Sequence, residues 1–161
     1  MASSAAHQSS WETSEVVFGI PLLISVILGF ILHLPIAYGL LRWAFIPVGL
    51  IIFAAGVGFI IAARRELARH DQPTDPGRPT REIVKSGVFS ISRNPLYLGI
   101  IFVVAGLGLS FNSWWIFIFL VVEIGLSHVV LVFPEERYLS ATFGEEYKAY
   151  KRSVYRWLGR R

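Results

Sequence analysis

Residues 95–133 read PLYLGIIFVVAGLGLSFNSWWIFIFLVVEIGLSHVVLVF, and this apolar stretch decides the fold. It contains no Lys, Arg or Asp, and Glu123 is its only carboxylate. A helix needs roughly 20 apolar residues to cross the hydrocarbon core of a bilayer, so the stretch is long enough for two crossings. The Asn-Ser pair at 112–113 is a turn signal. The stretch therefore predicts two membrane helices, at residues 95–111 and 114–133.

Two more uncharged stretches precede it, and each is also long enough to span a bilayer. They predict helices at residues 16–34 and 43–63, and Pro35 ends the first of them because proline removes a helical hydrogen bond. The chain has 161 residues, of which 54% are apolar and only 16% charged, a balance too apolar for an ordinary soluble domain. The predicted fold class is an all-α integral membrane protein with about four transmembrane helices.

We expect a single membrane-embedded domain over residues 1–161. Residues 1–63 carry the two N-terminal membrane helices, and residues 64–161 carry the remaining elements. These are a polar loop at 64–93, the two helices predicted above and an amphipathic tail at 134–161.

The composition also excludes several classes of site. The chain has no cysteine, so disulfides, thiolate metal sites and cysteine nucleophiles are excluded. Residues 1–14 have no basic n-region, which favours a retained first helix over a cleaved signal peptide. The net charge of +4 is explained by basic loops beside membrane helices, so no nucleic-acid partner is expected.

Basic residues are concentrated at two of the polar segments, and this predicts the orientation. Seven lie in the loop (Arg64, Arg65, Arg69, Arg78, Arg81, Lys85 and Arg93), and seven lie in the tail (Arg137, Lys148, Lys151, Arg152, Arg156, Arg160 and Arg161). The connection between the first two helices holds only Arg42. Loops rich in Lys and Arg stay in the cytoplasm, so the loop, the tail and both termini are predicted to be cytoplasmic.

The tail has its larger apolar side chains at helical spacing: Leu139, Phe143, Tyr147, Tyr150 and Val154. Gly144 is expected to separate two short helices. One interpretation is a tail that lies on the anionic inner leaflet. The alternative is a tail that folds back as a lid over a site made by the polar loop.

A first polar cluster, Arg93-Asn94-Pro95 with Tyr97, lies at the predicted start of the third helix. Asn at the N-cap and Pro at the first helical position explain it structurally. The functional interpretation uses the same geometry, because a helix N-terminus and an arginine fork both suit an anion.

A second polar cluster, Glu135-Glu136, follows the fourth helix. It is either an acidic first turn or a pair of carboxylates that hold a cationic or hydroxyl-rich ligand. Glu123 is a site candidate because ionisable groups inside a membrane are costly, although hydrogen bonding between helices would also explain it. No His or Asp accompanies it at ligand spacing, so no metal site is expected. Gly106 and Gly108 indicate close helix packing.

Together the two clusters resemble the signatures of a membrane methyltransferase family that includes isoprenylcysteine carboxyl methyltransferases and phospholipid N-methyltransferases. The first signature segment, residues 85–99, reads KSGVFSISRNPLYLG and is similar to S-G-x-[FY]…R-[HN]-P-x-Y-x-G. The second signature segment, residues 135–157, carries EERYL, FGEEY, a further Tyr-Lys, and then Val and Trp, similar to E-E-x-x-L…F-G-x-x-Y…Y…V…W. The resemblance covers roughly residues 73–158.

The resemblance implies a helical enzyme that uses S-adenosylmethionine in a cytoplasmic pocket, with a lipid-like or prenylated acceptor that enters from the bilayer. It implies that Arg93 and Glu135 are catalytic. The cofactor-binding residues that it implies are Asn94, Pro95, Tyr97, Glu136 and Tyr147. Many members have His where this chain has Asn94, and an Asn cannot shuttle a proton. Residues 124–134 also lack the arginine that enzymes acting on prenylcysteine carry before the Glu pair.

Two other hypotheses remain at this point. The C-terminal regions of NADPH-dependent sterol and steroid reductases look similar, and a non-catalytic membrane protein could have the same fold. Ligand-dependent melting separates the three. S-adenosylhomocysteine should stabilise the first class, NADPH the second, and neither ligand the third.

Overall fold

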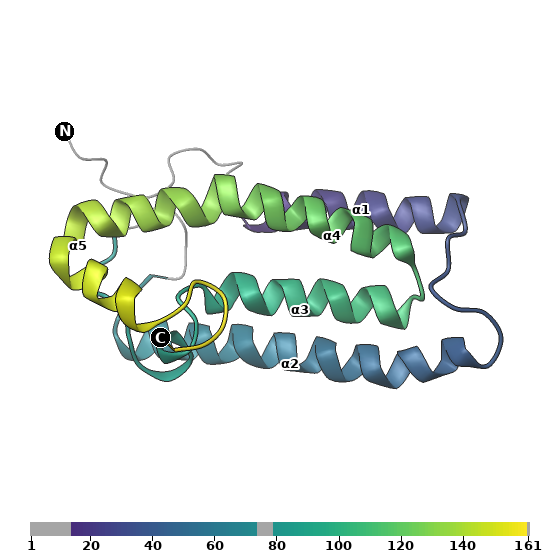
Figure 1. Ribbon diagram of the computed structural model, residues 1–161, viewed down its shortest axis with the longest axis horizontal. Coiled ribbons are helices and arrows are strands. Elements are labelled where there is room, and N and C mark those ends of the chain that lie inside the picture. The colour runs from purple at the N-terminus through teal and green to yellow at the C-terminus, as the bar shows by residue number, and fades with distance from the viewer. Residues whose placement is uncertain (1–13, 74–78, 161) are drawn as a thin grey trace.

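The computed structural model describes residues 14–73 and 79–160, and in this part of the chain every regular element is helical. The elements are α1 (Ser14–Ile31), α2 (Leu41–Arg69), the 3₁₀ turn η1 (Gly87–Ser90), α3 (Pro95–Ser110), α4 (Trp114–Ser127), the π-helical turn η2 (His128–Val132) and α5 (Phe133–Ser153). Figure 1 shows α1 to α4 lying roughly along one direction, with α5 continuing beyond α4 and then turning back. The cytoplasmic location predicted for the N-terminus concerns residues 1–13, which lie outside the described part of the chain.

Three helical runs are long and apolar enough to cross a membrane: Ser14–Ile31, Leu41–Arg69 and Trp114–Ser153. The helix α3 is also apolar but has only 16 residues. In the third run we treat α4 and η2 as the membrane-spanning part. Apart from Glu123, the charged residues of this run begin in α5. An all-α integral membrane protein with about four membrane helices is thereby confirmed.

The helix ends differ from the prediction at three places. The helix α1 ends at Ile31, three residues before the predicted end at residue 34. The helix α2 continues to Arg69 instead of ending at Ala63, so its last turns carry charged side chains beyond the apolar stretch. Pro134 was expected to begin a separate stretch, but the helical backbone runs through it from α4 into α5. The π-helical turn just before Pro134 explains this, because wider turns relieve the clash between a proline ring and the preceding carbonyl groups.

The helices α2 and α3 pack closely through glycines, as the glycines of α3 predicted. A Cβ atom added to Gly49 would lie 2.6 Å from the Gly106 carbonyl oxygen, and one added to Gly56 would lie 2.6 Å from the Gly99 carbonyl oxygen. Only hydrogen fits at these positions, so the two backbones approach each other directly. Gly108 instead packs against Phe117 of α4.

The helix α1 packs against α4, and a small core lies where both meet α3. Val104, Ile116 and Leu120 are its buried centre. At the far end from the signature segments, Asn112 closes the α3–α4 turn by exchanging two hydrogen bonds with the backbone of Ala37, at 3.0 and 2.8 Å. This ties the α1–α2 connection to the α3–α4 turn, so all four helices are joined at that end.

The tail folds back over the loop, as the second interpretation predicted. Gly144 has a positive φ of 52°, and the helix bends sharply there (Figure 1). Beyond the bend, Tyr147, Tyr150 and Val154 form a buried cluster with Leu139 and Phe143, which confirms the predicted apolar face. Tyr150 also donates a hydrogen bond to the Phe89 carbonyl at 2.6 Å, so the tail is fixed to the first signature segment.

Candidate functional site

The main cavity has a volume of about 580 Å³ and lies where α2 ends and α3 begins. Both signature segments line it, although about forty residues separate the two clusters in the sequence. The lining residues from these segments are Phe89, Arg93, Asn94, Pro95, Leu96, Tyr97, Glu135, Tyr138, Leu139, Tyr147 and Tyr150. The first helix, the end of α2 and the loop complete the wall. A volume of this size is typical of a small-molecule site.

One end of the main cavity is polar and acidic. Tyr97, in the first turn of α3, donates a hydrogen bond to Oε2 of Glu135 at 3.2 Å. Glu15 of α1 and Glu82 of the loop also line the cavity. Arg64 is a basic residue in the same wall. This end can therefore bind ammonium groups and hydroxyl groups.

The other part of the main cavity is apolar and lies between the membrane helices. Its walls come from α1, α2 and α3: Phe18, Gly19, Leu22, Ile60, Ile100, Val103 and Val104. Val104 lies two helical turns deeper along α3 than Tyr97. The cavity therefore joins a polar region to an apolar one, as a site for an amphiphile requires.

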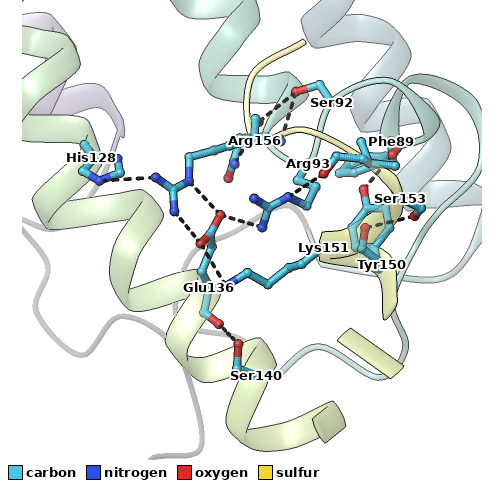
Figure 2. Close-up of polar contacts among 12 residues, drawn as sticks. Phe89, Ser92, Arg93, His128, Glu136, Ser140, Tyr150, Lys151, Ser153 and Arg156 are labelled. Atoms are coloured by element: carbon cyan, nitrogen blue, oxygen red, sulfur yellow. Dashed lines mark hydrogen bonds and ion pairs between the residues drawn. The ribbon is translucent and has the colours of Figure 1, made fainter. Parts of the chain in front are cut away.

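Glu136 faces a different environment from Glu135. Its Oε1 accepts hydrogen bonds from Arg93 Nη1 at 2.8 Å and from Arg156 Nε at 2.9 Å, and its Oε2 accepts one from Arg156 Nη2 at 2.8 Å. Lys151 Nζ lies 3.7 Å from Oε2. Figure 2 shows both guanidinium groups pointing at the Glu136 carboxylate. Burial raises the pKa of Glu136, but the Arg156 hydrogen bond and the charges of Arg93, Arg156 and Lys151 outweigh it and lower the pKa.

The C-terminal residues 154–160, here called the tail strap, cover the segment before α3. Arg93 Nε donates to the Val154 carbonyl at 3.1 Å, and Asn94 Nδ2 donates to the Arg156 carbonyl at 3.2 Å. The Gly159 amide donates to the Ile91 carbonyl at 2.7 Å. Arg93 and Asn94 thus hold the tail in place with the side chains that we expected to bind a ligand.

Asn94 is the N-cap residue of α3, as predicted, but its side chain makes no capping hydrogen bond. The tail strap offers the Asn94 amide a carbonyl partner that is remote in sequence, and the Asn94 backbone amide donates instead to Ser92 Oγ at 3.1 Å. Pro95 does occupy the first turn of α3, as expected.

The structure brings six of the seven predicted site residues to the main cavity. They are Arg93, Asn94, Pro95, Tyr97, Glu135 and Tyr147. Glu136 does not line the cavity, because its carboxylate is directed to the two arginines. Arg156 was missed by the sequence reasoning, since nothing distinguishes it from the six other basic residues of the tail. Glu15 was missed because it looked like part of a polar helix start.

Glu123 is completely buried, and neither of its carboxylate oxygens has a hydrogen-bond partner among the described residues. The expected hydrogen bond between helices is therefore not seen. In the same part of the chain, no group of three or more His, Cys, Asp or Glu side chains could hold a metal ion.

Comparison with known proteins gave one family. A family model described as phospholipid methyltransferase matches residues 44–146, which is well over half of the chain. No curated protein and no solved structure matched. The matched range runs from α2 through both polar clusters to the bend at Gly144.

Proposed function

This chain belongs to the phospholipid methyltransferase family, and we propose that it transfers a methyl group from S-adenosylmethionine to a lipid-like acceptor in the membrane. The observation that carries the proposal is the main cavity. It joins an acidic polar end, between the two signature segments, to an apolar part between α1, α2 and α3. The family match favours this hypothesis over a membrane reductase.

The residues of the polar end fit the cofactor chemically. When bound, S-adenosylmethionine supplies a methyl group already activated on a sulfonium. Glu135, oriented by Tyr97, is suited to its ammonium group or its ribose hydroxyls. The first-turn amides of α3 beside Pro95 lack helical acceptors and suit its carboxylate. Tyr147 also lines the cavity, and its ring suits a cationic centre, as the approach of Lys151 Nζ to 5.9 Å from the ring centroid indicates.

Arg93 and Glu136 act by position in this proposal. Their mutual ion pair and the tail strap fix the start of α3 against the start of α5, and so keep Tyr97 and Glu135 hydrogen-bonded to each other at the cavity. Arg93 was predicted to be catalytic, with a guanidinium that suits an anion. Its guanidinium is already engaged by Glu136 and the Val154 carbonyl, so we assign it to the walls of the site instead.

The acidic lining favours an amine as the acceptor group. The carboxylates in the cavity lining attract an ammonium group to the polar end; they are Glu15, Glu82 and Glu135. Arg64, a basic residue of the same lining, can bind a headgroup phosphate. A bound ammonium has no lone pair, so its nitrogen must lose a proton before it attacks the methyl carbon. A carboxylate of the polar end that the cofactor does not engage, such as Glu15, can accept that proton.

A transfer assay on the purified protein tests the proposed function. S-adenosylhomocysteine should raise the melting temperature in detergent, and NADPH should leave it unchanged. With radiolabelled S-adenosylmethionine, label should appear in a lipid with a primary-amine headgroup and not in a lipid with a glycerol headgroup. Stabilisation by NADPH alone, or by neither ligand, would overturn the proposal. If label appeared only in a prenylcysteine acceptor, the proposal that the acceptor group is an amine would be wrong.

We also propose that the signature end of the molecule faces the cytoplasm, as the distribution of basic residues predicted. Because the chain has no cysteine, single-cysteine variants give a clean test. Tyr38→Cys lies in the α1–α2 connection and Lys85→Cys lies in the loop, and both residues are exposed. We expect an impermeant maleimide added to intact cells to label only Tyr38→Cys. Labelling of both variants from the outside, or of Lys85→Cys alone, would contradict the orientation.

A further inference from the structure

Four polar side chains meet where α2 ends, outside the contacts described so far. Glu66 and His70 come from the end of α2, and Glu82 and Ser86 come from the segment that leads into η1. His70 Nδ1 lies 2.7 Å from Glu82 Oε1, and His70 Nε2 lies 3.0 Å from Ser86 Oγ. The Ser86 hydroxyl in turn donates a hydrogen bond to Glu66 Oε1.

Gly87 lets this cluster form. Its φ is +55°, and an added Cβ would lie 2.8 Å from the Glu66 carboxylate. The Ser86-Gly87 pair of the first signature segment therefore packs directly against the Glu66 side chain. The Glu66 side chain is only 9% exposed, and its other hydrogen-bond donor is Arg69 at 3.2 Å.

Counting protons shows which form of His70 the cluster needs. The single hydroxyl proton of Ser86 is given to Glu66, so Ser86 can only accept from the imidazole. His70 must then donate from Nε2 to Ser86 and from Nδ1 to the carboxylate of Glu82. An imidazole that donates from both nitrogens is an imidazolium. Its positive charge lies between two carboxylates, with Glu66 Oε1 at 3.8 Å.

A neutral His70 cannot make the same set of bonds. With one proton on Nδ1, its Nε2 becomes an acceptor, and the Ser86 hydroxyl must choose between His70 and Glu66. Either choice removes one hydrogen bond between α2 and the loop. With the proton on Nε2 instead, both Ser86 bonds remain, but the bond from Nδ1 to Glu82 is lost. Histidine is the side chain that ordinarily changes its charge between pH 5 and 8.

The other charged groups nearby do not replace this proton. Arg69 is bonded to Glu66 and stays charged across that range. Lys85, next to Ser86 in the sequence, is directed away to Glu146 at 2.7 Å. The charge state of His70 therefore decides whether all of these hydrogen bonds between the loop and α2 can form together.

The held segment is a wall of the main cavity. Glu82, Ile83, Val84 and Phe89 all line it. Gln72 lines it as well, and its side chain donates to the His70 carbonyl at 2.9 Å. Ile83 also packs against the buried cluster of the tail, so a shift of this segment reaches the second signature segment.

We infer that Glu66, Glu82, Ser86 and protonated His70 form a latch that positions the loop wall of the main cavity, and that ligand affinity falls when His70 loses its proton. The choice of ligand rests on the proposed function. The latch itself rests only on the cluster, so it also has a readout that needs no ligand.

The experiment compares the wild type with His70→Gln at pH 6 and pH 8 in detergent. Calorimetric titration measures S-adenosylhomocysteine affinity, and hydrogen exchange without ligand measures protection of the Phe89 and Ser92 amides, which bond to the Ser86 and Val88 carbonyls. In the wild type, both should fall about three- to tenfold from pH 6 to pH 8, as for the loss of one hydrogen bond. In His70→Gln both should be independent of pH and close to the wild-type values at pH 8.

His33→Gln is the matched control, because His33 lies at the opposite end of the bundle beside Asn112 and Ser113. It should keep the wild-type response to pH. Equal values at both pH values in the wild type, or a response that persists in His70→Gln, would overturn the latch. If S-adenosylhomocysteine does not bind at either pH, the proposed function fails, and amide protection alone then decides for or against the latch.

Discussion

Replacing Glu136 with Gln should lower the free energy of unfolding by about 3–5 kcal/mol, the usual cost of removing one partner from a buried ion pair. The Glu136 and Arg93 side chains are each only 6% exposed, and Arg156 adds two hydrogen bonds to the same carboxylate. A neutral amide leaves both guanidinium groups without a counter-charge. The NH₂ group of the amide is also a hydrogen-bond donor, and it would face the two guanidinium groups, which can only donate. Equilibrium unfolding by SDS titration in mixed micelles measures the loss.

The matched control for this change is Glu146→Gln, also in α5. Glu146 pairs with Lys85 at 2.7 Å, but both side chains are about half exposed. An exposed pair of this kind contributes only about 0–1 kcal/mol. We also expect trypsin to cut at Arg152 and Arg156 faster in Glu136→Gln than in the control, because the tail strap loses its anchor. Similar unfolding free energies for the two variants would show that the buried network does not hold the tail.

Replacing Glu135 with Gln should weaken S-adenosylhomocysteine binding ten- to a hundredfold, while the protein stays folded. Burial raises the pKa of Glu135 to about 7, so the comparison is made at pH 8, where the carboxylate is charged. A charge-assisted hydrogen bond contributes about 1.5–3 kcal/mol, which corresponds to that change in affinity. The amide keeps the size of the carboxylate and still offers Tyr97 a carbonyl acceptor, so the wall itself should persist. Titration calorimetry in detergent measures the affinity, and the melting temperature without ligand reports the fold.

The control for the ligand experiment is Glu145→Gln. Glu145 belongs to the same helix α5 but pairs with Lys148 at the surface, and its side chain is 78% exposed. Its replacement should leave the affinity unchanged within about twofold, as for most surface substitutions. Small and equal changes in the two variants would mean that Glu135 only begins a helix, and the proposed cofactor site would lose its acidic group.

The membrane architecture was readable from the sequence because it depends on composition over long windows. Apolar stretches of about 20 residues specify helices wherever they occur, since a bilayer leaves no other partner for their backbone groups. The tail's apolar face was readable for a similar reason, because Tyr147, Tyr150 and Val154 recur at helical spacing. The pairing of the two polar clusters followed from the predicted topology, because the start of the third helix and the end of the fourth lie on the same side of the membrane.

The different environments of Glu135 and Glu136 could not be read from the sequence. Neighbouring residues of a helix point about 100° apart, so one faces the main cavity and the other faces Arg93 and Arg156. Which direction is which depends on where the tail strap returns, and that follows from the bend at Gly144 and the packing of Tyr150 on the loop. The latch could not be predicted from the sequence either, because it depends on contacts of His70 with Ser86 and Glu82 that only the fold creates. The sequence by itself determined the membrane helices and the residue types at their ends, which are local properties. Only the tertiary structure decided which carboxylate binds arginine and which faces the main cavity, because that depends on contacts between segments distant in the chain.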